Sequence, residues 1–273
     1  MRNIERHVVK DAVAAIFCEV IMASFRLLGL IPRTWAARMG NGLGQLFFYI
    51  DKRHREIALN NLKLAFGHEE TPDQIQQLAR KVFRNLGRIL FEIGWALRLN
   101  PEDFSRYFSI RHLSRLEAAY QKGKGVLILT GHMGNWELLT VIGRMIGYPT
   151  SIVFRPLDFA PLNRFFERFR GRFGARLIPS QWAMAGILRS LKRGELVAVL
   201  LDQNVDWYQG VFVDFFKTPA CTNKGLALLA MKSGAPVVQM FLVRDGDRFR
   251  AEIGQEIPLV RTGDQIKDVE ANT

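Results

Sequence analysis

The chain has 273 residues, 38 of them basic and 26 acidic, so its formal net charge at pH 7 is +12. Hydrophobic residues make up 48% and charged residues 23%, which excludes an intrinsically disordered chain and a multi-span membrane protein. The two cysteines, Cys18 and Cys221, exclude a disulfide framework and a structural zinc site and favour a reducing compartment. The positive charge predicts an anionic partner: nucleic acid, an anionic membrane surface or an acidic carrier protein. Twenty phenylalanines favour lipid among these partners.

The N-terminal segment is strongly apolar over residues 12–32, but Glu19 and Arg26 interrupt it. Its uncharged pieces are shorter than the roughly 20 residues of a transmembrane helix, and no signal-peptide cleavage site follows. We expect residues 1–40 to form a membrane-anchoring segment whose helix lies in the membrane interface, with its basic residues at anionic headgroups. These basic residues are Arg2, Arg6, Lys10, Arg33 and Arg38. A buried core helix and a tilted single span are the alternatives.

Helical spacing dominates as far as about residue 120, and Thr71 followed by Pro72 predicts the start of a helix that ends near Leu99. From residue 125 onward, short continuous apolar runs indicate strands that are buried on both faces. These runs are 125–130, 151–154, 196–201 and 236–242, and helical patterns separate them at 136–146, 162–173, 183–193 and 224–233. Residues 41–273 are therefore predicted to form one α/β domain, with a central, mostly parallel sheet flanked by helices.

The first of these strands leads into Thr130-Gly131-His132-Met133-Gly134-Asn135-Trp136-Glu137. Chemistry in α/β sheets gathers at the carboxyl ends of strands, and His132 follows such an end between two glycines. Glu137 falls in the first turn of the next helix, and a histidine oriented by a carboxylate is a general base. The chain has no G-x-S-x-G nucleophile segment and no similarly placed cysteine. The base is therefore expected to act on a substrate hydroxyl, as in group transfer onto an alcohol.

The segment from His132 to Glu137 resembles the HxxxxD/E motif of the glycerolipid acyltransferase superfamily. Its H-x-G-N-W-E form is similar to that of the lipid A late acyltransferases of Gram-negative bacteria. Further blocks of that family have counterparts in the same order: Asn60-Asn61-Leu62, Phe154-Arg155-Pro156-Leu157-Asp158, Leu201-Asp202-Gln203-Asn204, Val211–Phe216 with Ala220 and Thr222, and Gly234–Val238. By this resemblance the chain is identified as a member of the family over about residues 10–260.

The resemblance implies an O-acyltransferase in which His132 removes the proton of an acceptor hydroxyl and Glu137 fixes the tautomer of the imidazole. The co-substrate would be a thioester of acyl carrier protein or coenzyme A, with no further cofactor and no metal. Arg155 is the candidate for binding an oxyanion or a phosphate, and a surface pair with Asp158 is its alternative role. Four residues are expected to shape the substrate site: Asn135, Asp158, Asp202 and Gln203.

Three arginines at helical spacing form a row beside a row of phenylalanines. They are Arg164, Arg168 and Arg172. The arginine row is a candidate for binding the acidic carrier or a phosphorylated headgroup. A solvated helix face over a phenylalanine core is an equal alternative.

The resemblance also implies a lipid A precursor as acceptor, anionic membrane lipid as a partner, and the cytoplasmic face of the bacterial inner membrane as location. The chain would be peripheral and monotopic, or cross the membrane once. A lysophospholipid or another glycolipid is the alternative acceptor, and a non-catalytic basic protein that binds membrane surfaces is the alternative of a different class. Nucleic acid is not expected, because the basic residues are scattered and no binding motif occurs.

Two positions depart from the family pattern, Lys217 in place of a glycine and Phe159 in place of an asparagine. Family members continue through a further helix and a basic tail, so we expect the C-terminal end to be truncated at residue 273. The acyl chain length and the oligomeric state are not predicted.

Overall fold

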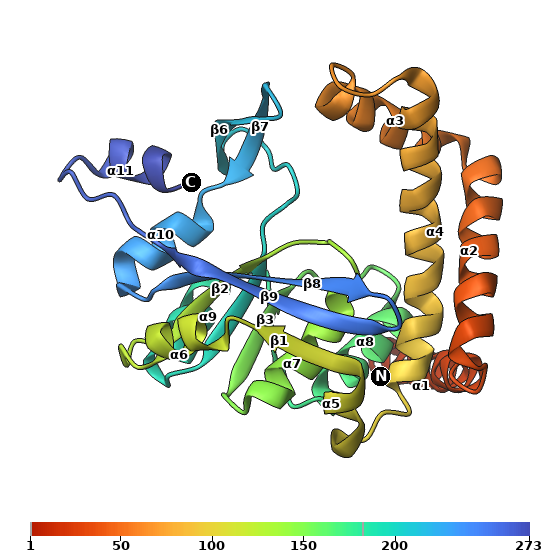
Figure 1. The fold of residues 1–273 in the computed structure, drawn as a ribbon. Coiled ribbons are helices and arrows are strands. Elements are labelled where there is room, and N and C mark those ends of the chain that lie inside the picture. The colour runs from red at the N-terminus through yellow and green to blue at the C-terminus, as the bar shows by residue number, and fades with distance from the viewer. Residues whose placement is uncertain (1, 182) are drawn as a thin grey trace. The chain divides into compact units, whose positions relative to one another are not determined.

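The computed structural model describes residues 2–181 and 183–273, and alternating strands and helices follow an N-terminal run of helices (Figure 1). The α-helices are α1 (Arg2–Leu28), α2 (Arg33–Ile50), α3 (Lys52–Phe66), α4 (Pro72–Ala96), α5 (Phe104–Tyr107), α6 (Leu113–Tyr120), α7 (Leu139–Ile146), α8 (Ala160–Arg172), α9 (Ala183–Lys192), α10 (Gly225–Ser233) and α11 (Gln265–Asn272). The short 3-10 helices are η1 (Pro101–Asp103) and η2 (Trp136–Leu138). The strands are β1 (Phe108–Arg111), β2 (Val126–Thr130), β3 (Thr150–Phe154), β4 (Arg176–Pro179), β5 (Leu196–Leu200), β6 (Gly210–Phe215), β7 (Thr218–Asn223), β8 (Val237–Asp245) and β9 (Arg248–Ile257).

The chain divides into two compact units. The sheet unit contains the N-terminal residues up to Glu19, Asn100–Val213 and Ala220–Thr273. The helical unit contains Val20–Leu99 and Asp214–Pro219. The sequence suggested a boundary at residue 40, between a membrane-anchoring segment and the α/β domain. That boundary is defined by contact with a membrane and stays a prediction.

The sheet unit is built on a seven-stranded sheet with the order β1-β9-β8-β2-β5-β3-β4, flanked by helices (Figure 1). Neighbouring strands run parallel, except that β8 and β9 are antiparallel. The predicted α/β class with a mostly parallel sheet is confirmed, and the four apolar runs are β2, β3, β5 and β8.

The central strands β2 and β5 pair residue by residue from Val126↔Leu196 to Thr130↔Leu200. One face of these strands packs against α9 and α10. The buried residues of this core are Leu127, Ile178, Ile187, Leu191, Val197, Leu226, Leu229, Ala230, Ala235 and Val237. Because β2 and β5 end at the same level, the residues that follow each of them emerge together at one edge of the sheet.

A buried carboxylate ties the opposite ends of three strands together. Glu195, just before β5, accepts hydrogen bonds from Ser151 of β3, Arg176 of β4 and Arg193. Burial opposes ionisation of Glu195, but the hydrogen bonds from Arg193 and Ser151 outweigh it, so the pKa of Glu195 lies below its usual value. A carboxyl with a lowered pKa stabilises the fold above the unfolded-state pKa, and this contribution is lost as the pH falls through the folded-state pKa.

Several strands were not predicted from the sequence, and each of them lacks a continuous apolar run. In β9 buried residues alternate with more exposed ones, among them Arg250 and Glu252. The strands β1 and β4 have four residues each and lie at the two edges of the sheet. The strand β1 also interrupts the region that we expected to be helical as far as residue 120. The hairpin β6–β7 forms a separate two-stranded sheet.

The predicted N-terminal helix is present as α1, but its apolar residues are not confined to one face. Cys18 and Met22 are buried, whereas Ile16 and Phe17 are exposed. Within the sheet unit, Arg168 of α8 donates a hydrogen bond to Glu19 and forms an ion pair with it. The side chains of Arg2, Arg6 and Lys10 lie outside the described residues.

Among the described residues, no single helix is both long and apolar enough to cross a bilayer. One bent pair, Val13–Leu28 with Arg33–Ile50, meets the length and composition requirement together, with an angle of 118° at the bend.

The helical unit is held by α2 and α4, which lie side by side (Figure 1). The helix α4 begins with the predicted cap: Thr71 and Gln74 form a capping box, and Pro72 occupies the first turn. Glycines let the two backbones meet. A Cβ placed on Gly40 would lie 2.8 Å from the Cα of Arg88, and one on Gly44 would collide with the carbonyl oxygen of Phe83.

Replacing Gly44 by alanine should therefore destabilise the protein. Alanine has the higher helix propensity, but its methyl group meets backbone that has no alternative rotamer, and such overpacking costs about 1–3 kcal/mol. Gly42 lies on the same helix with no atom within 4 Å of the added methyl group. The Gly42→Ala control should stabilise by about 0.5–1 kcal/mol through the unfolded state. Thermal and urea unfolding measure both changes, and the same sign for both would contradict the close packing of α2 on α4.

Candidate active site

The candidate base lies where two neighbouring strands end. His132 follows β2 and Asp202 follows β5, so the parallel pairing of these strands brings together two residues that are 70 positions apart. The main-chain N–H of Leu201 donates to the carbonyl of Thr130 at 3.1 Å, which continues the pairing to the start of both loops.

Asp202 contacts His132 at two places. Its Oδ2 accepts from the main-chain N–H of His132 at 2.7 Å, and its Oδ1 lies 2.8 Å from the imidazole Nδ1. A carboxylate can only accept, so we assign the proton to Nδ1 and the free lone pair to Nε2. The His132 side chain is 35% exposed, which leaves it accessible to a substrate. Trp136 packs edge-on against the imidazole, with ring centroids 5.0 Å apart.

Two glycines are required by the shape of this loop. A Cβ on Gly131 would lie 3.0 Å from the carboxylate carbon of Asp202, so a side chain there would push the carboxylate away from His132. Gly134 has a φ of +64°, and a Cβ there would collide with the carbonyl oxygen of Leu242. Both positions therefore favour glycine for steric reasons.

The second acidic residue of the motif, Glu137, is bound by an arginine. Arg170 of α8 donates from Nε to Oε2 of Glu137 at 2.9 Å and from Nη2 to Oε1 at 2.7 Å. The Glu137 side chain is only 6% exposed and that of Arg170 17%. The guanidinium also lies over the rings of Phe154 and Phe166. This bidentate pair joins the loop after β2 to helix α8.

The two carboxylates thus have different partners from those expected from the motif. Sequence proximity suggested that Glu137 orients His132, but the carboxylate that contacts the imidazole is that of Asp202. Asp202 was expected only to shape the site from the side. The catalytic roles of these residues stay predictions.

The remaining candidates differ in burial. Arg155 follows β3 and is exposed, and among the described residues no hydrogen bond or ion pair of its side chain is found. Asp158 and Gln203 are exposed, whereas Asn135 is fully buried. The role of Arg155 in binding an oxyanion or a phosphate stays a prediction. In the part of the chain that the structure describes, no group of three His, Cys, Asp or Glu side chains is placed to hold a metal ion.

The predicted arginine row divides into residues with different surroundings. Arg168 pairs with Glu19 of α1, and this hydrogen bond raises the pKa of Arg168. Arg172 is exposed, and Arg164 is half-buried. Phe165 and Phe169 of the neighbouring row are fully buried. The phenylalanine row is therefore core.

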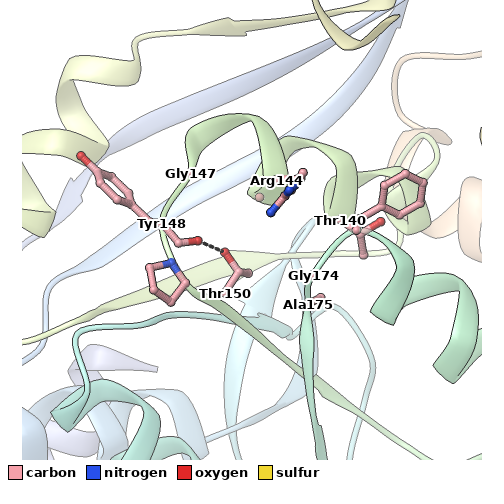
Figure 2. A pocket seen from close by; sticks show the side chains of 10 residues that line it. Thr140, Arg144, Gly147, Tyr148, Thr150, Gly174 and Ala175 are labelled. Atoms are coloured by element: carbon pink, nitrogen blue, oxygen red, sulfur yellow. Dashed lines mark hydrogen bonds between the residues drawn. The ribbon is translucent and has the colours of Figure 1, made fainter. Parts of the chain in front are cut away.

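A cavity of about 250 Å³ lies away from this site (Figure 2). Its lining comes from the end of α7, the start of β3 and the segment before β4, and includes Arg144, Tyr148, Thr150 and Gly174. The hydroxyl of Thr150 donates to the carbonyl of Tyr148 at 3.0 Å, as Figure 2 shows. Because the cavity adjoins the amino end of β3, whereas His132 follows the carboxyl end of β2, we assign it no part in the chemistry.

Arg170 was not among the site residues predicted from the sequence. It lies between Arg168 and Arg172 of the arginine row, near Phe166 and the C-cap residue Phe173 on α8. A cation beside the phenylalanines of a helix is a signal for a buried ion pair, because burying an unpaired charge is costly.

Removing one member of the Glu137–Arg170 pair should be strongly destabilising. Glu137→Ala leaves a buried guanidinium without a counterion, which costs about 3–5 kcal/mol. The matched control is Glu256→Ala, which breaks the exposed pair of Glu256 with Lys122 and should cost at most about 1 kcal/mol. Thermal unfolding compares the two variants, and equal small losses would show that the Glu137–Arg170 pair contributes little to the fold.

Comparisons with known proteins agree with the motif resemblance. A model of the family described as "Bacterial lipid A biosynthesis acyltransferase" matches residues 8–271. A lipid A biosynthesis acyltransferase of Haemophilus influenzae is 27% identical over 229 residues, covering 84% of this chain and 70% of the relative. The lipid A biosynthesis palmitoleoyltransferase of Escherichia coli is 28% identical, covering 77% and 68%. The lauroyltransferase of the same organism is 28% identical, covering 76% and 67%. The chain therefore belongs to the bacterial lipid A biosynthesis acyltransferase family and is an O-acyltransferase.

Proposed function

We propose that this protein transfers a fatty acyl chain from an acyl carrier protein thioester to a hydroxyl of a lipid A precursor, at the cytoplasmic face of the bacterial inner membrane. Family membership supports the reaction class and a lipid A acceptor. The observation that carries the mechanism is the contact of Asp202 with the Nδ1 of His132, since it leaves Nε2 available as a base.

In the proposed reaction, Nε2 of His132 removes the proton of the acceptor hydroxyl as the hydroxyl oxygen attacks the thioester carbonyl. A C–O bond forms and the C–S bond breaks. The proton passes from the imidazolium to the leaving thiolate, so the products are an ester and a thiol. Asp202 stabilises the imidazolium and holds the ring in one orientation.

We assign the other residues to support this step. Arg155, exposed after β3, provides a bidentate donor for the developing oxyanion or for a phosphate of the acceptor. Glu137 acts through Arg170 by holding the His132 loop against α8. Asn135, buried within the loop after β2, supports it from inside, while Asp158 and Gln203 border the site from the segments that follow β3 and β5.

Membrane association through residues 12–32 belongs to the same proposal, and exposed apolar residues of α1 such as Ile16, Phe17 and Leu27 support it. A lysophospholipid or another glycolipid is the alternative acceptor. Mass spectrometry of the lipids formed from mixed carrier thioesters and these acceptors distinguishes them.

The role of the base is tested by three variants. His132→Ala should lower kcat by about 10²–10⁴-fold, because a proton transfer is lost. Asp202→Asn should lower kcat by about 10²-fold or more with little change in KM, because the amide no longer fixes the tautomer. The double variant should be scarcely slower than His132→Ala alone, since the two residues act as one unit.

The variant Glu137→Gln distinguishes the role of Glu137 from that of Asp202. If Glu137 holds only the loop, this variant loses thermal stability, and its remaining folded fraction keeps most of its kcat at low temperature. Near-normal turnover of folded His132→Ala would overturn the mechanism. A kcat loss for folded Glu137→Gln as large as that for Asp202→Asn would return the orienting role to Glu137.

Docking of the acidic carrier on α8 is tested at Arg172, an exposed member of the arginine row. Arg172→Glu should raise the KM for carrier-bound donor several-fold at low salt, and the difference should shrink as salt screens the charges. The KM for an acyl-pantetheine thioester, which lacks the carrier, should not change. Arg189→Glu on α9 is the matched control for an exposed arginine. An unchanged KM for the carrier thioester would identify the row as a solvated face.

A further inference from the structure

The helix α2 has an unusual distribution of side chains between its two faces. Small residues and one phenylalanine face α4: Ala36, Gly40, Gly44 and Phe48 are buried. Large apolar residues are on the outside, between 48% and 66% exposed: Trp35, Met39, Leu46, Phe47, Tyr49 and Ile50. A helix that borders water normally carries its large apolar residues inward and its charges outward.

Charge is confined to the ends of α2. Residues 39–50 contain no charged side chain. Arg33 and Arg38 lie at the start of the helix, where their guanidinium groups stand over the rings of Trp95 and Trp35. A second basic group, Lys52-Arg53-His54-Arg55, follows its end. Aromatic and basic residues at the ends of an apolar helix are typical of the boundary between acyl chains and headgroups.

The connection to α1 allows both helices to reach the same surface. The two helices meet at a bend of 118°, next to the exposed Leu30. Two straight segments that meet at a corner always share a plane. Both can therefore lie along one bilayer surface, although neither alone is long and apolar enough to cross it.

We propose that the outer face of α2 lies in the anionic bilayer surface, so that the membrane-contacting segment extends beyond residues 12–32 as far as Ile50. This inference rests on the proposed membrane association. A lipid surface fits the face better than a second copy of the chain does. Both ends of α2 are basic, so two aligned copies would repel in either orientation, whereas anionic headgroups attract both ends.

Depth-dependent quenching tests the proposal on the full chain. Single cysteines at Leu46→Cys and Ile50→Cys receive an environment-sensitive fluorophore, and the protein is mixed with phosphatidylethanolamine and phosphatidylglycerol vesicles that carry brominated acyl chains. Leu27→Cys reports on α1. Ile266→Cys on α11 is the matched control, because it is 74% exposed and has Asp264, Lys267 and Asp268 close by in sequence. The chain without added cysteines corrects for labelling of the buried Cys18 and Cys221.

We expect quenching at positions 46 and 50 to exceed that at position 266 by at least about two-fold. Quenching at position 27 without quenching at 46 and 50 would overturn the inference and leave the membrane association of α1 intact. Quenching needs no catalysis, so an inactive protein that is quenched at 46 and 50 would support the inference while contradicting the proposed function.

A second measurement uses charge. Leu46→Glu with Ile50→Glu should weaken partition into the same vesicles by about tenfold or more, whereas Ile266→Glu should not. Circular dichroism confirms that both variants keep their helices, which we expect because the substituted side chains are exposed. If the double variant instead abolishes self-association in sedimentation experiments without vesicles, and partition is unchanged, a second copy covers α2 and the inference is wrong.

Discussion

The parallel pairing of β2 with β5 is the constraint on which the candidate site depends. Their register runs without interruption to Thr130↔Leu200, so the next residues of both strands leave the sheet at the same level. Asp202 can then bind both the main chain and the imidazole of His132. Gly131 makes this approach sterically possible. A shift of one residue in either strand would move every side chain to the other face of the sheet and separate the pair. The core that packs against α9 and α10 holds this register, so the hydrophobic packing beneath the sheet and the geometry of the base are linked.

The sequence predicted the strands that matter most, because β2 and β5 are continuous apolar runs. It did not predict the carboxylate that contacts His132, and the reason is topological. A motif shows which residues are close along the chain, so Glu137 was the natural partner for His132. The strand order decides which residues are close in space, and that order places β5 rather than the helix after β2 beside the histidine. The negative charge of Glu137 is satisfied by Arg170 instead. The strand β9, between β1 and β8, was not predicted because its buried residues alternate with polar ones.

The arginines of α8 lie close together in the sequence but have different surroundings in the structure. Arg168 binds the N-terminal helix through Glu19, and Arg170 enters the interior to pair with Glu137. Arg172 is exposed at the end of the helix. The turn of the β6–β7 hairpin gives a similar example. Phe216 and Lys217 both have positive φ values, 51° and 60°, in a two-residue turn of the kind that favours glycine or asparagine. The glycine expected from the family pattern at position 217 therefore has a backbone reason, and Lys217 adopts the same conformation at a cost in strain.

The packing of α2 on α4 links the structure of the helical unit to its proposed environment. In water, the free energy gained per buried apolar area would favour turning Leu46, Phe47 and Ile50 inward, and the glycines outward. In a lipid environment this driving force is weak, because acyl chains are as apolar as leucine, and close backbone contact between small residues contributes more. The observed arrangement, with Gly40 and Gly44 against α4 and the large side chains outside, is the one that the second environment favours. The proposed bilayer surface around the outer face of α2 would account for two features together: why the glycines are buried and why the large apolar residues are not.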